Sequence, residues 1–217
     1  TFKYPRDITT DGTNLYVADR SNHTIRKIVI STGAVTTLAG SGTAGSTDTT
    51  GTAAKFYYPR GITTDGINLY VADTHNHKIR KIVISTGAVT TLAGSTSHGS
   101  TDGTGTSAKF YYPRGIITDG TNLYVADTNN HTIRKIVIST RAVTTFAGST
   151  SSGSTDATGT SAKFYYPRGI TTDGTNLYVA DSDNHLIRKI VISTGAVTTF
   201  AGSTSAGSTD GTGTSAK

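Results

Sequence analysis

The chain repeats itself every 54 residues, and this period constrains its fold more than any other feature. Pro5, Pro59, Pro113 and Pro167 open the copies, and the hexapeptide NLYVAD follows each proline at the same distance. No insertion or deletion interrupts the pattern, so the 217 residues hold four copies. A fixed period of this length is typical of solenoids, propellers and other repeat arrays, in which each unit buries its apolar faces against its neighbours.

The composition favours strands over helices. The sequence contains no Glu or Gln, which are good helix formers, and is rich in Thr, Val, Ile and Tyr, which are common in strands. It also contains no Cys, which excludes disulfides and thiolate chemistry. No apolar run approaches the length of about 18 residues that suggests a membrane span, and no signal peptide is expected at Thr1. The formal net charge of +6 is spread over four copies, so the positive charge is not concentrated in one basic segment.

One copy reads as four short strands separated by turns. In the second copy we expect strands at residues 61–64, 68–72, 78–85 and 88–93, the first two joined through the turn pair Asp65-Gly66. Four antiparallel strands repeated in series form the blades of a β-propeller, and a β-sandwich is the alternative. We therefore predict an all-β propeller of four four-stranded blades. It would be a single domain over residues 1–217, with blades at about 5–58, 59–112, 113–166, and 167–217 together with 1–4.

Ring closure stays open at this stage. Four blades could close on themselves, two chains could pair into an eight-bladed ring, or further blades could belong to a longer chain. The repeat frame at Lys217 is continued by Phe2, as Lys55 is continued by Phe56. This match favours the closed ring of four slightly, and it would serve two chains joined head to tail equally.

The stretch PRGITTDGINLYVADTHNHKIRKI, residues 59–82, resembles the NHL repeat, whose name is spelled by Asn184-His185-Leu186. The resemblance covers essentially the whole chain, and it departs from the family at Thr24, Lys78 and Thr132, where the name-giving Leu is replaced. NHL proteins commonly form propellers of six blades, and this chain has four copies. The resemblance implies a binding or scaffolding module. Some animal members bind RNA on a basic face, and some related propellers are enzymes.

The loop-rich face of the propeller is the expected binding surface. Strand parity places the loops between second and third strands, and the long linkers between blades, on one face. The copies differ mostly there, so we single out the following positions as candidate contacts: Arg20, His75, His98, Asn129 and Asp183.

Four arginines, one per copy, form the strongest repeated charge on this face. Each stands just before the first strand, which lines the channel of a propeller, so they would ring the channel mouth: Arg6, Arg60, Arg114 and Arg168. Such a ring could bind carboxylate or phosphate groups bidentately. The alternative, which we favour from sequence alone, is that each arginine pairs with the Asp at the end of a second strand, such as Asp73, or with Asp7 in the first copy.

A repeated Asp-x-x-Asn-His set is interpreted as turn chemistry. Its members would satisfy one another and the loop backbone, as buried polar groups must, and no metal site or cofactor is expected. The set comprises Asp19, Asn22, His23, Asp73, Asn76, His77, Asp127, Asn130, His131, Asp181, Asn184 and His185.

We therefore expect a non-enzymatic module that presents a loop-rich face to a protein or to an anionic or polymeric ligand. Near-perfect repetition leaves no place for two carboxylates in different environments, which acid–base catalysis requires. One alternative is a structural repeat segment of a longer surface or filament protein, associating blade to blade. Another is RNA binding, in which Arg80 and Lys81 would act together with Tyr57, Tyr58 and Arg60. The Thr/Ser/Gly-rich loops suggest a secreted or cell-surface bacterial protein, with a cytoplasmic one as the alternative, and no membrane insertion.

Overall fold

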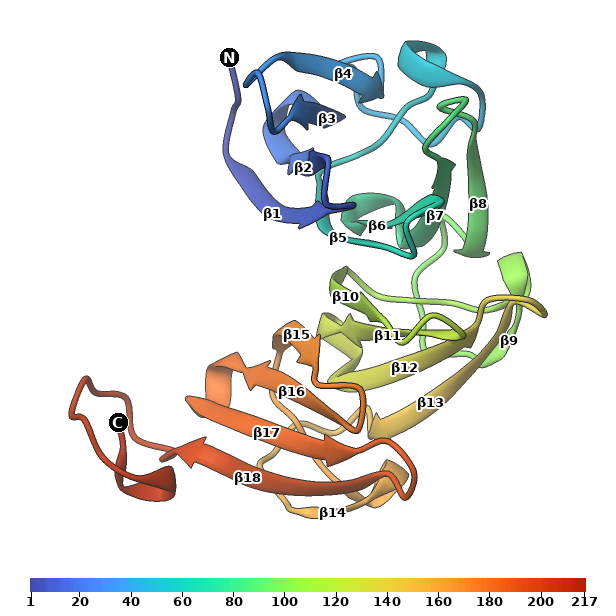
Figure 1. Cartoon of the computed structure of the whole chain (residues 1–217). Helices are drawn as coiled ribbons and strands as arrows, with labels where there is room; N and C mark the ends of the chain where they lie inside the picture. Colours follow the sequence, from blue (N-terminus) through green and yellow to red (C-terminus); the bar gives the residue numbers. More distant parts are fainter.

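The computed structural model describes all 217 residues as strands joined by turns and three-residue 3₁₀ turns. The main strands form four antiparallel sheets, one per copy of the repeat (Figure 1). The first sheet holds β1 (Pro5–Thr10), β2 (Asn14–Asp19), β3 (Thr24–Val29) and β4 (Val35–Ala39). The second holds β5 (Pro59–Thr64), β6 (Asn68–Asp73), β7 (Lys78–Val83) and β8 (Val89–Gly94). No helix combines the length and apolar character needed to span a bilayer.

The third and fourth sheets each gain a short fifth strand. The third holds β10 (Pro113–Thr118), β11 (Asn122–Asp127), β12 (Thr132–Val137) and β13 (Ala142–Gly148), with β9 (Gly103–Thr104) at its edge. The fourth holds β15 (Pro167–Thr172), β16 (Asn176–Asp181), β17 (Leu186–Val191) and β18 (Ala196–Gly202), with β14 (Ala157–Thr158). The predicted all-β fold of four four-stranded blades is confirmed.

The first hairpin of each blade is fixed by the Asp-Gly pair that the sequence marks as a turn. In the second blade the Asp65 carboxylate accepts hydrogen bonds from the backbone N–H groups of Ile67 and Asn68, at 2.9 and 2.6 Å. The hydroxyl of Tyr70 donates to the same carboxylate at 2.8 Å. Gly66 has a φ of +87°, a left-handed conformation that favours glycine. The turn therefore sets the pairing of β5 with β6.

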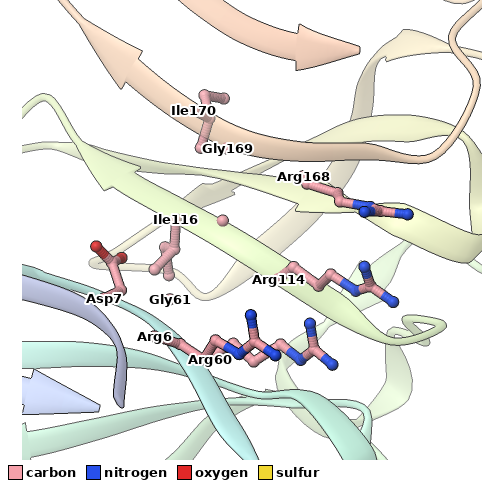
Figure 2. Close-up of a pocket in the computed structure, with 10 residues that line it drawn as sticks. Arg6, Asp7, Arg60, Gly61, Arg114, Ile116, Arg168, Gly169 and Ile170 are labelled. Atoms are coloured by element: carbon pink, nitrogen blue, oxygen red, sulfur yellow. The ribbon is translucent and has the colours of Figure 1, made fainter. Parts of the chain in front are cut away.

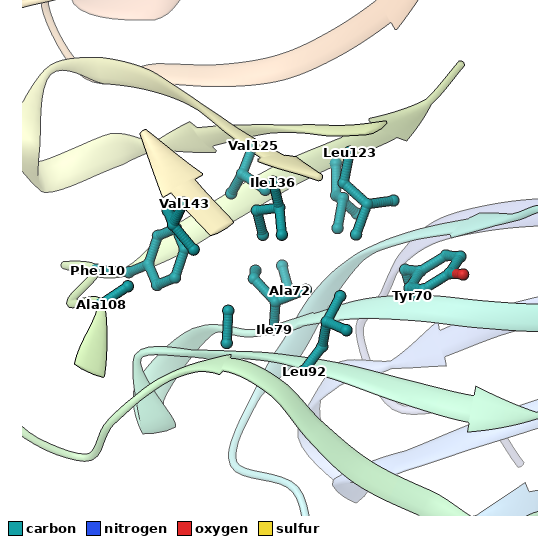
Figure 3. Close-up of a cluster of buried hydrophobic side chains, with 12 residues drawn as sticks. Tyr70, Ala72, Ile79, Leu92, Ala108, Phe110, Leu123, Val125, Ile136 and Val143 are labelled. Carbon is teal, nitrogen blue, oxygen red and sulfur yellow. The ribbon is translucent and has the colours of Figure 1, made fainter. Parts of the chain in front are cut away.

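Three apolar clusters hold the blades together, one in each seam between consecutive blades. Figure 3 shows the cluster between the second and third blades, where Ile79 and Leu92 of one sheet face Leu123 and Ile136 of the next. Phe110, from the linker between the blades, is fully buried in the same cluster. Each blade thus uses one face against the preceding blade and the other face against the following blade.

The four blades form an open arc and not a closed ring (Figure 1). Each inner strand packs beside the next, in the order β1, β5, β10 and β15, and β15 makes no comparable contact with β1. Ile8 of the first blade is consequently 54% exposed, whereas its counterparts Ile62 and Ile116 are each 3% exposed. The slight preference for a self-closed ring of four was wrong. The angle between blades is set by the side chains that fill each seam, and the repeat period carries no information about it.

A buried arginine on the third strand fastens each linker to the blade that follows it. Arg134 donates to the carboxylates of Asp127 at 3.0 Å and Asp102 at 2.6 Å, and to the carbonyl oxygens of Lys109 and Thr101. Its side chain is fully buried, as is that of Asp127. Since Asp102 and Lys109 belong to the linker, this one guanidinium joins linker and blade. The equivalent ion pairs are Arg80 with Asp73 and Asp48, and Arg188 with Asp181 and Asp156.

The Asn-His pair also works across the seam. Asn76 donates from its side-chain amide to the Asp73 carboxylate at 2.8 Å and to the carbonyl oxygen of Gly45, in the preceding linker, at 2.6 Å. His77 ends the 3₁₀ turn Thr74–Asn76 in a left-handed conformation, and its Nδ1 accepts the backbone N–H of Tyr112 at 3.1 Å. The repeated polar set therefore shapes its own turn, as expected, and also binds both adjoining linkers.

Candidate anion-binding mouth

The four repeated arginines line one open pocket at the inner edge of the arc. Each is the second residue of an inner strand, so the parallel arrangement of β1, β5, β10 and β15 around the arc brings them together: Arg6, Arg60, Arg114 and Arg168. Figure 2 shows their guanidinium groups gathered on the same side of the pocket. The sequence therefore predicted correctly that these side chains converge.

The predicted pairing of these arginines with second-strand aspartates, or with Asp7 in the first copy, was wrong in all four copies. Asp73 bonds Arg80 instead, at 2.7 Å, and Asp7 accepts the backbone N–H of Ile62 at 3.0 Å. Only Arg168 has a carboxylate partner, Asp183, at 3.2 Å. The reason is that the second-strand aspartates point into the seams, where the buried third-strand arginines reach them.

The pocket lined by the four arginines, which we call the mouth, is strongly electropositive as a result. Burial and the neighbouring guanidinium groups, with Arg114 first among them, lower the pKa of Arg60 to about 10. Burial and the charge of Arg168 lower the pKa of Arg114 as well. The Nε atoms of Arg60 and Arg114 are buried and have no hydrogen-bond partner. Two crowded guanidinium groups thus lack the anionic partner that would offset their mutual repulsion.

Three of the variable positions, Arg20, His75 and Asp183, lie beside this mouth, and Asp183 is the partner of Arg168. Arg20 places its guanidinium carbon 4.4 Å from the ring centroid of Tyr58, a cation–π contact. The ring of His75 lies 4.8 Å from that of Tyr58 and 4.9 Å from that of Tyr112. Burial, followed by the positive charges of Arg60 and Arg20, lowers the pKa of His75 to about 4. His75 therefore adds a neutral ring to the rim of the mouth at neutral pH.

The low pKa of His75 predicts that acid destabilises the fold through this residue. Unfolded histidine protonates near pH 6.5, so between pH 6.5 and 4 the unfolded state binds a proton that the folded state does not. The free energy of unfolding should then fall as the pH falls, by about 1 kcal/mol from this partly exposed group. His75→Asn, which matches Asn129 in the third copy, should flatten this part of the curve. Urea unfolding at pH 7 and at pH 5 measures this change in the free energy of unfolding. If the change is equal in the unmodified protein and in His75→Asn, the prediction is contradicted.

The two remaining candidates, His98 and Asn129, do not line the pocket. His98 is exposed and its ring stacks on Tyr111 with 4.4 Å between centroids. Asn129 sits in the 3₁₀ turn Thr128–Asn130 and donates its backbone N–H to the carbonyl oxygen of Tyr111 at 3.0 Å. No group of three or more His and Asp side chains is arranged to hold a metal ion. These two residues belong to the loop face but not to the mouth.

Sequence reasoning missed the glycines that let the mouth form. A Cβ placed on Gly61 would lie 2.1 Å from the carbonyl oxygen of Arg114, and one on Gly115 would lie 2.2 Å from that of Arg168. Adjacent inner strands therefore touch backbone to backbone. In the first copy Asp7 occupies this position and its carboxylate accepts the N–H of Ile62, so it lines the pocket without pairing with an arginine. The signal was available, because a glycine follows three of the four arginines.

Comparison with known proteins finds the NHL repeat both by a family profile and among similar proteins. A profile of the NHL repeat matches residues 56–82 and 164–190. NHL repeat-containing protein 2 from Bos taurus is 37% identical over 144 residues, which cover 61% of this chain and 20% of the relative. A structural genomics protein from Bacteroides thetaiotaomicron, described as of unknown function, has 27% identity and a TM-score of 0.69 over 89% of this chain and 47% of that chain.

A further solved structure shows the same fold. An auxiliary nutrient binding protein from Bacteroides ovatus has 21% identity and a TM-score of 0.69, covering 92% of this chain and 49% of that chain. The chain thus spans about a fifth of the length of the bovine relative and about half the length of each similar solved chain. The matched residues belong to the second and fourth copies, and the other two copies share their motifs and contacts. The chain therefore carries NHL repeats in its second and fourth blades, and its first and third blades share their sequence motifs.

Proposed function

We propose that the chain is a non-enzymatic binding module whose loop face holds an anionic ligand at the four-arginine mouth. The observation that carries this proposal is that Arg60 and Arg114 lie crowded at the mouth without a carboxylate partner. In the seams, by contrast, Arg80, Arg134 and Arg188 each pair with two carboxylates. An uncompensated charge cluster of this kind lowers the stability of the free protein and gains most from a bound anion.

The chemistry of the mouth defines the ligand class. A guanidinium group binds carboxylate or phosphate through two parallel N–H donors, and Arg60 and Arg114 stand on neighbouring strands of one pocket. A ligand with two or more such groups can engage both arginines together. Arg6 and Arg168 extend the charge to each side, which suits a polyanion that crosses the mouth.

Binding without catalysis is supported by the carboxylates near the mouth. Asp7 is engaged by the backbone N–H groups of Ile62 and Ile8, and Asp183 by Arg168. Neither is placed opposite a second carboxylate, as an acid–base pair requires. The Thr/Ser/Gly-rich loops support placing this module on a cell surface or outside the cell. The nutrient binding named for the similar Bacteroides ovatus protein belongs to the same class of function, and the likeness at 21% identity shows the fold alone.

The test is binding of small polyanions to arginine variants. Isothermal titration of pyrophosphate and of citrate at low salt should show binding to the unmodified chain, and Arg114→Ala should weaken it about 10- to 100-fold, the range that 1.5–3 kcal/mol for a charge-assisted hydrogen bond implies. Arg141→Gly is the matched control. It removes the same charge from the exposed turn between β12 and β13, where the other copies have glycine.

Equal losses for Arg114→Ala and Arg141→Gly would show that net charge, and not the mouth, attracts the anion. Absence of binding to both anions would count against the proposed function. A single-stranded oligoribonucleotide is included in the same titrations. If it alone binds, with an affinity that falls steeply as salt rises, the RNA alternative replaces the proposal.

A second candidate function, a structural repeat segment that associates blade to blade, is favoured by the open ends of the arc. Ile187 on the last blade is 40% exposed and Ile8 on the first is 54% exposed, although the internal counterparts Ile133 and Ile116 are 0% and 3% exposed. Surfaces that are buried in every internal seam are therefore displayed at both ends.

A further inference from the structure

The two ends of the arc each carry one half of the seam that joins consecutive blades. We infer that the last blade and the C-terminal segment 203–217 of one chain bind the first blade of a second copy, head to tail. The proposed joint would repeat the three internal seams contact by contact. Its test is the mass of the assembly and not anion binding, so its failure and the failure of the proposed anion-binding function are distinguishable.

The first blade offers the receiving half. Its outward face forms a largely apolar groove lined by Phe2, Ile8, Val17 and Ile28 together with Pro5, Arg6 and Asp7. Phe2 is 39% exposed, whereas its counterpart Phe110 is fully buried. In the internal seams the same face of each blade is covered by the blade before it. The groove is therefore shaped for the face of a preceding blade.

The last blade offers the inserting half. Ile187 is 40% exposed, whereas its counterparts Ile79 and Ile133 are fully buried against the following blade. The segment 203–217 corresponds to the internal linkers, and Figure 1 shows it extending beyond β18 with no following blade beside it. The inserting half therefore combines an uncovered sheet face with a linker that has no blade to bind.

The charges of the two halves are complementary. Arg26 of the first blade bonds only Asp19, at 3.3 Å, whereas Arg80, Arg134 and Arg188 each bond a linker carboxylate as well. Asp210 holds the position that Asp102 occupies in the linker to the third blade, and it is exposed with no ion pair. Each internal seam joins these two positions, so Asp210 of one copy fits Arg26 of the next.

The uncharged hydrogen-bonding groups of the two ends are complementary as well, because each end carries one partner of a bond that the internal seams complete. Internally, each His Nδ1 accepts the N–H of the Tyr in the next blade, as His131 does from Tyr166 at 3.2 Å. At the ends, His185 has no such donor, and Tyr4 has no such acceptor. Asn22 donates to the carbonyl oxygen of Thr1, although its counterparts donate to the linker glycine, the position that Gly207 holds.

The register of the joint follows from the period. Thr1 and Lys217 occupy the same position of the repeat. If Phe2 of the second copy takes the place after Lys217 of the first, both Lys217 and Thr1 compete for the position before it. Thr1 is exposed and at the chain end, so it can be displaced, and Asn22 then exchanges the Thr1 carbonyl for that of Gly207. Such a contact is heterologous: it closes a ring when the arc angles allow it and otherwise extends a filament.

The first experiment measures absolute mass by light scattering over a tenfold concentration range. The unmodified chain should have at least twice the single-chain mass. Asp210→Lys should raise the concentration of half-association about 10- to 100-fold, because it replaces a charge-assisted ion pair with repulsion of Arg26. Thr204→Lys is the matched control and should change it little, since the counterparts Thr96 and Thr150 are exposed in the internal seams. A single-chain mass throughout, or equal effects of the two lysines, would overturn the inference.

A mixing experiment tests the direction of the joint. Ile8→Asp blocks the receiving half and Asp210→Lys blocks the inserting half, and both positions are exposed in the single chain, so both variants should fold. Each alone should have the mass of one chain at a concentration where the unmodified protein is associated. Mixed in equal amounts they should form a species of two chains, because one intact joint remains. A mixture that stays at one chain would exclude head-to-tail association.

Discussion

Replacing Arg134 with Ala should lower the free energy of unfolding by about 3–5 kcal/mol, the cost of removing one partner from a buried ion pair. The side chain of Asp127 is fully buried beside Arg134 and would keep only the side-chain amide of Asn130 and the backbone N–H of Tyr111 as donors. The linker would also lose the bond through which Asp102 is held. The substitution would therefore weaken both the contacts within the blade and those between the blade and its linker.

Urea unfolding followed by circular dichroism measures this loss, with Arg26→Ala as the matched control. Arg26 occupies the same strand position but bonds no linker and is 17% exposed, so its removal should have a clearly smaller effect. Adding Asp127→Asn to Arg134→Ala should recover part of the loss, because no uncompensated charge then stays buried. If Arg26→Ala and Arg134→Ala were equally destabilising, the linker contacts would have no share in the stability of the seam.

Replacing Gly115 with Ala should be the second most damaging change, at or above the upper end of the 1–3 kcal/mol that overpacking usually costs. The new Cβ would lie 2.2 Å from the carbonyl oxygen of Arg168, which is a backbone atom and cannot turn aside as a side chain can. The inner strands β10 and β15 would have to separate. Since Arg114 and Arg168 flank this contact, anion binding at the mouth should weaken as well.

Two further variants make this prediction specific. Gly169→Ala should be nearly neutral, because its Cβ would meet only the Ala180 side chain at 3.6 Å, an ordinary contact. Gly115→Asp should be tolerated better than Gly115→Ala, although Asp is larger. The first copy has Asp7 at this position, and its carboxylate accepts the N–H of the neighbouring inner strand. Thermal unfolding ranks the three variants, and a greater loss for Gly115→Asp than for Gly115→Ala would contradict the argument.

The blades could be predicted from the sequence because the interactions that define each hairpin join residues close to one another in the chain. The hairpin around Asp65-Gly66 depends on side chains within five residues of one another, as the bond from Tyr70 to Asp65 illustrates. The convergence of the four arginines was predictable for a related reason. Equivalent positions on inner strands must meet around a common axis, whatever the number of blades.

The arginine partners and the closure of the ring could not be predicted in this way. Asp73 has Arg60 and Arg80 as candidate partners in sequence, and the choice depends on which side of the sheet each side chain occupies in the seam. The opening of the arc depends on the wedge angle that Phe110, Leu92 and their neighbours impose between sheets. Both are properties of packing between blades, and no single copy of the repeat encodes them.

The hydrogen bonds that cross the seams have a consequence for how the chain reaches this structure. They join residues 16 to 55 positions apart, from Tyr57 and Asp73 at the short end to Ile62 and Asp7 at the long end. An open arc needs no contact between its first and last blades, so loop-closure entropy is limited to about one repeat at each step. Such low contact order favours rapid folding that proceeds from one end to the other. A blade can be completed as soon as the segment after it leaves the ribosome, while the rest of the chain is still being made.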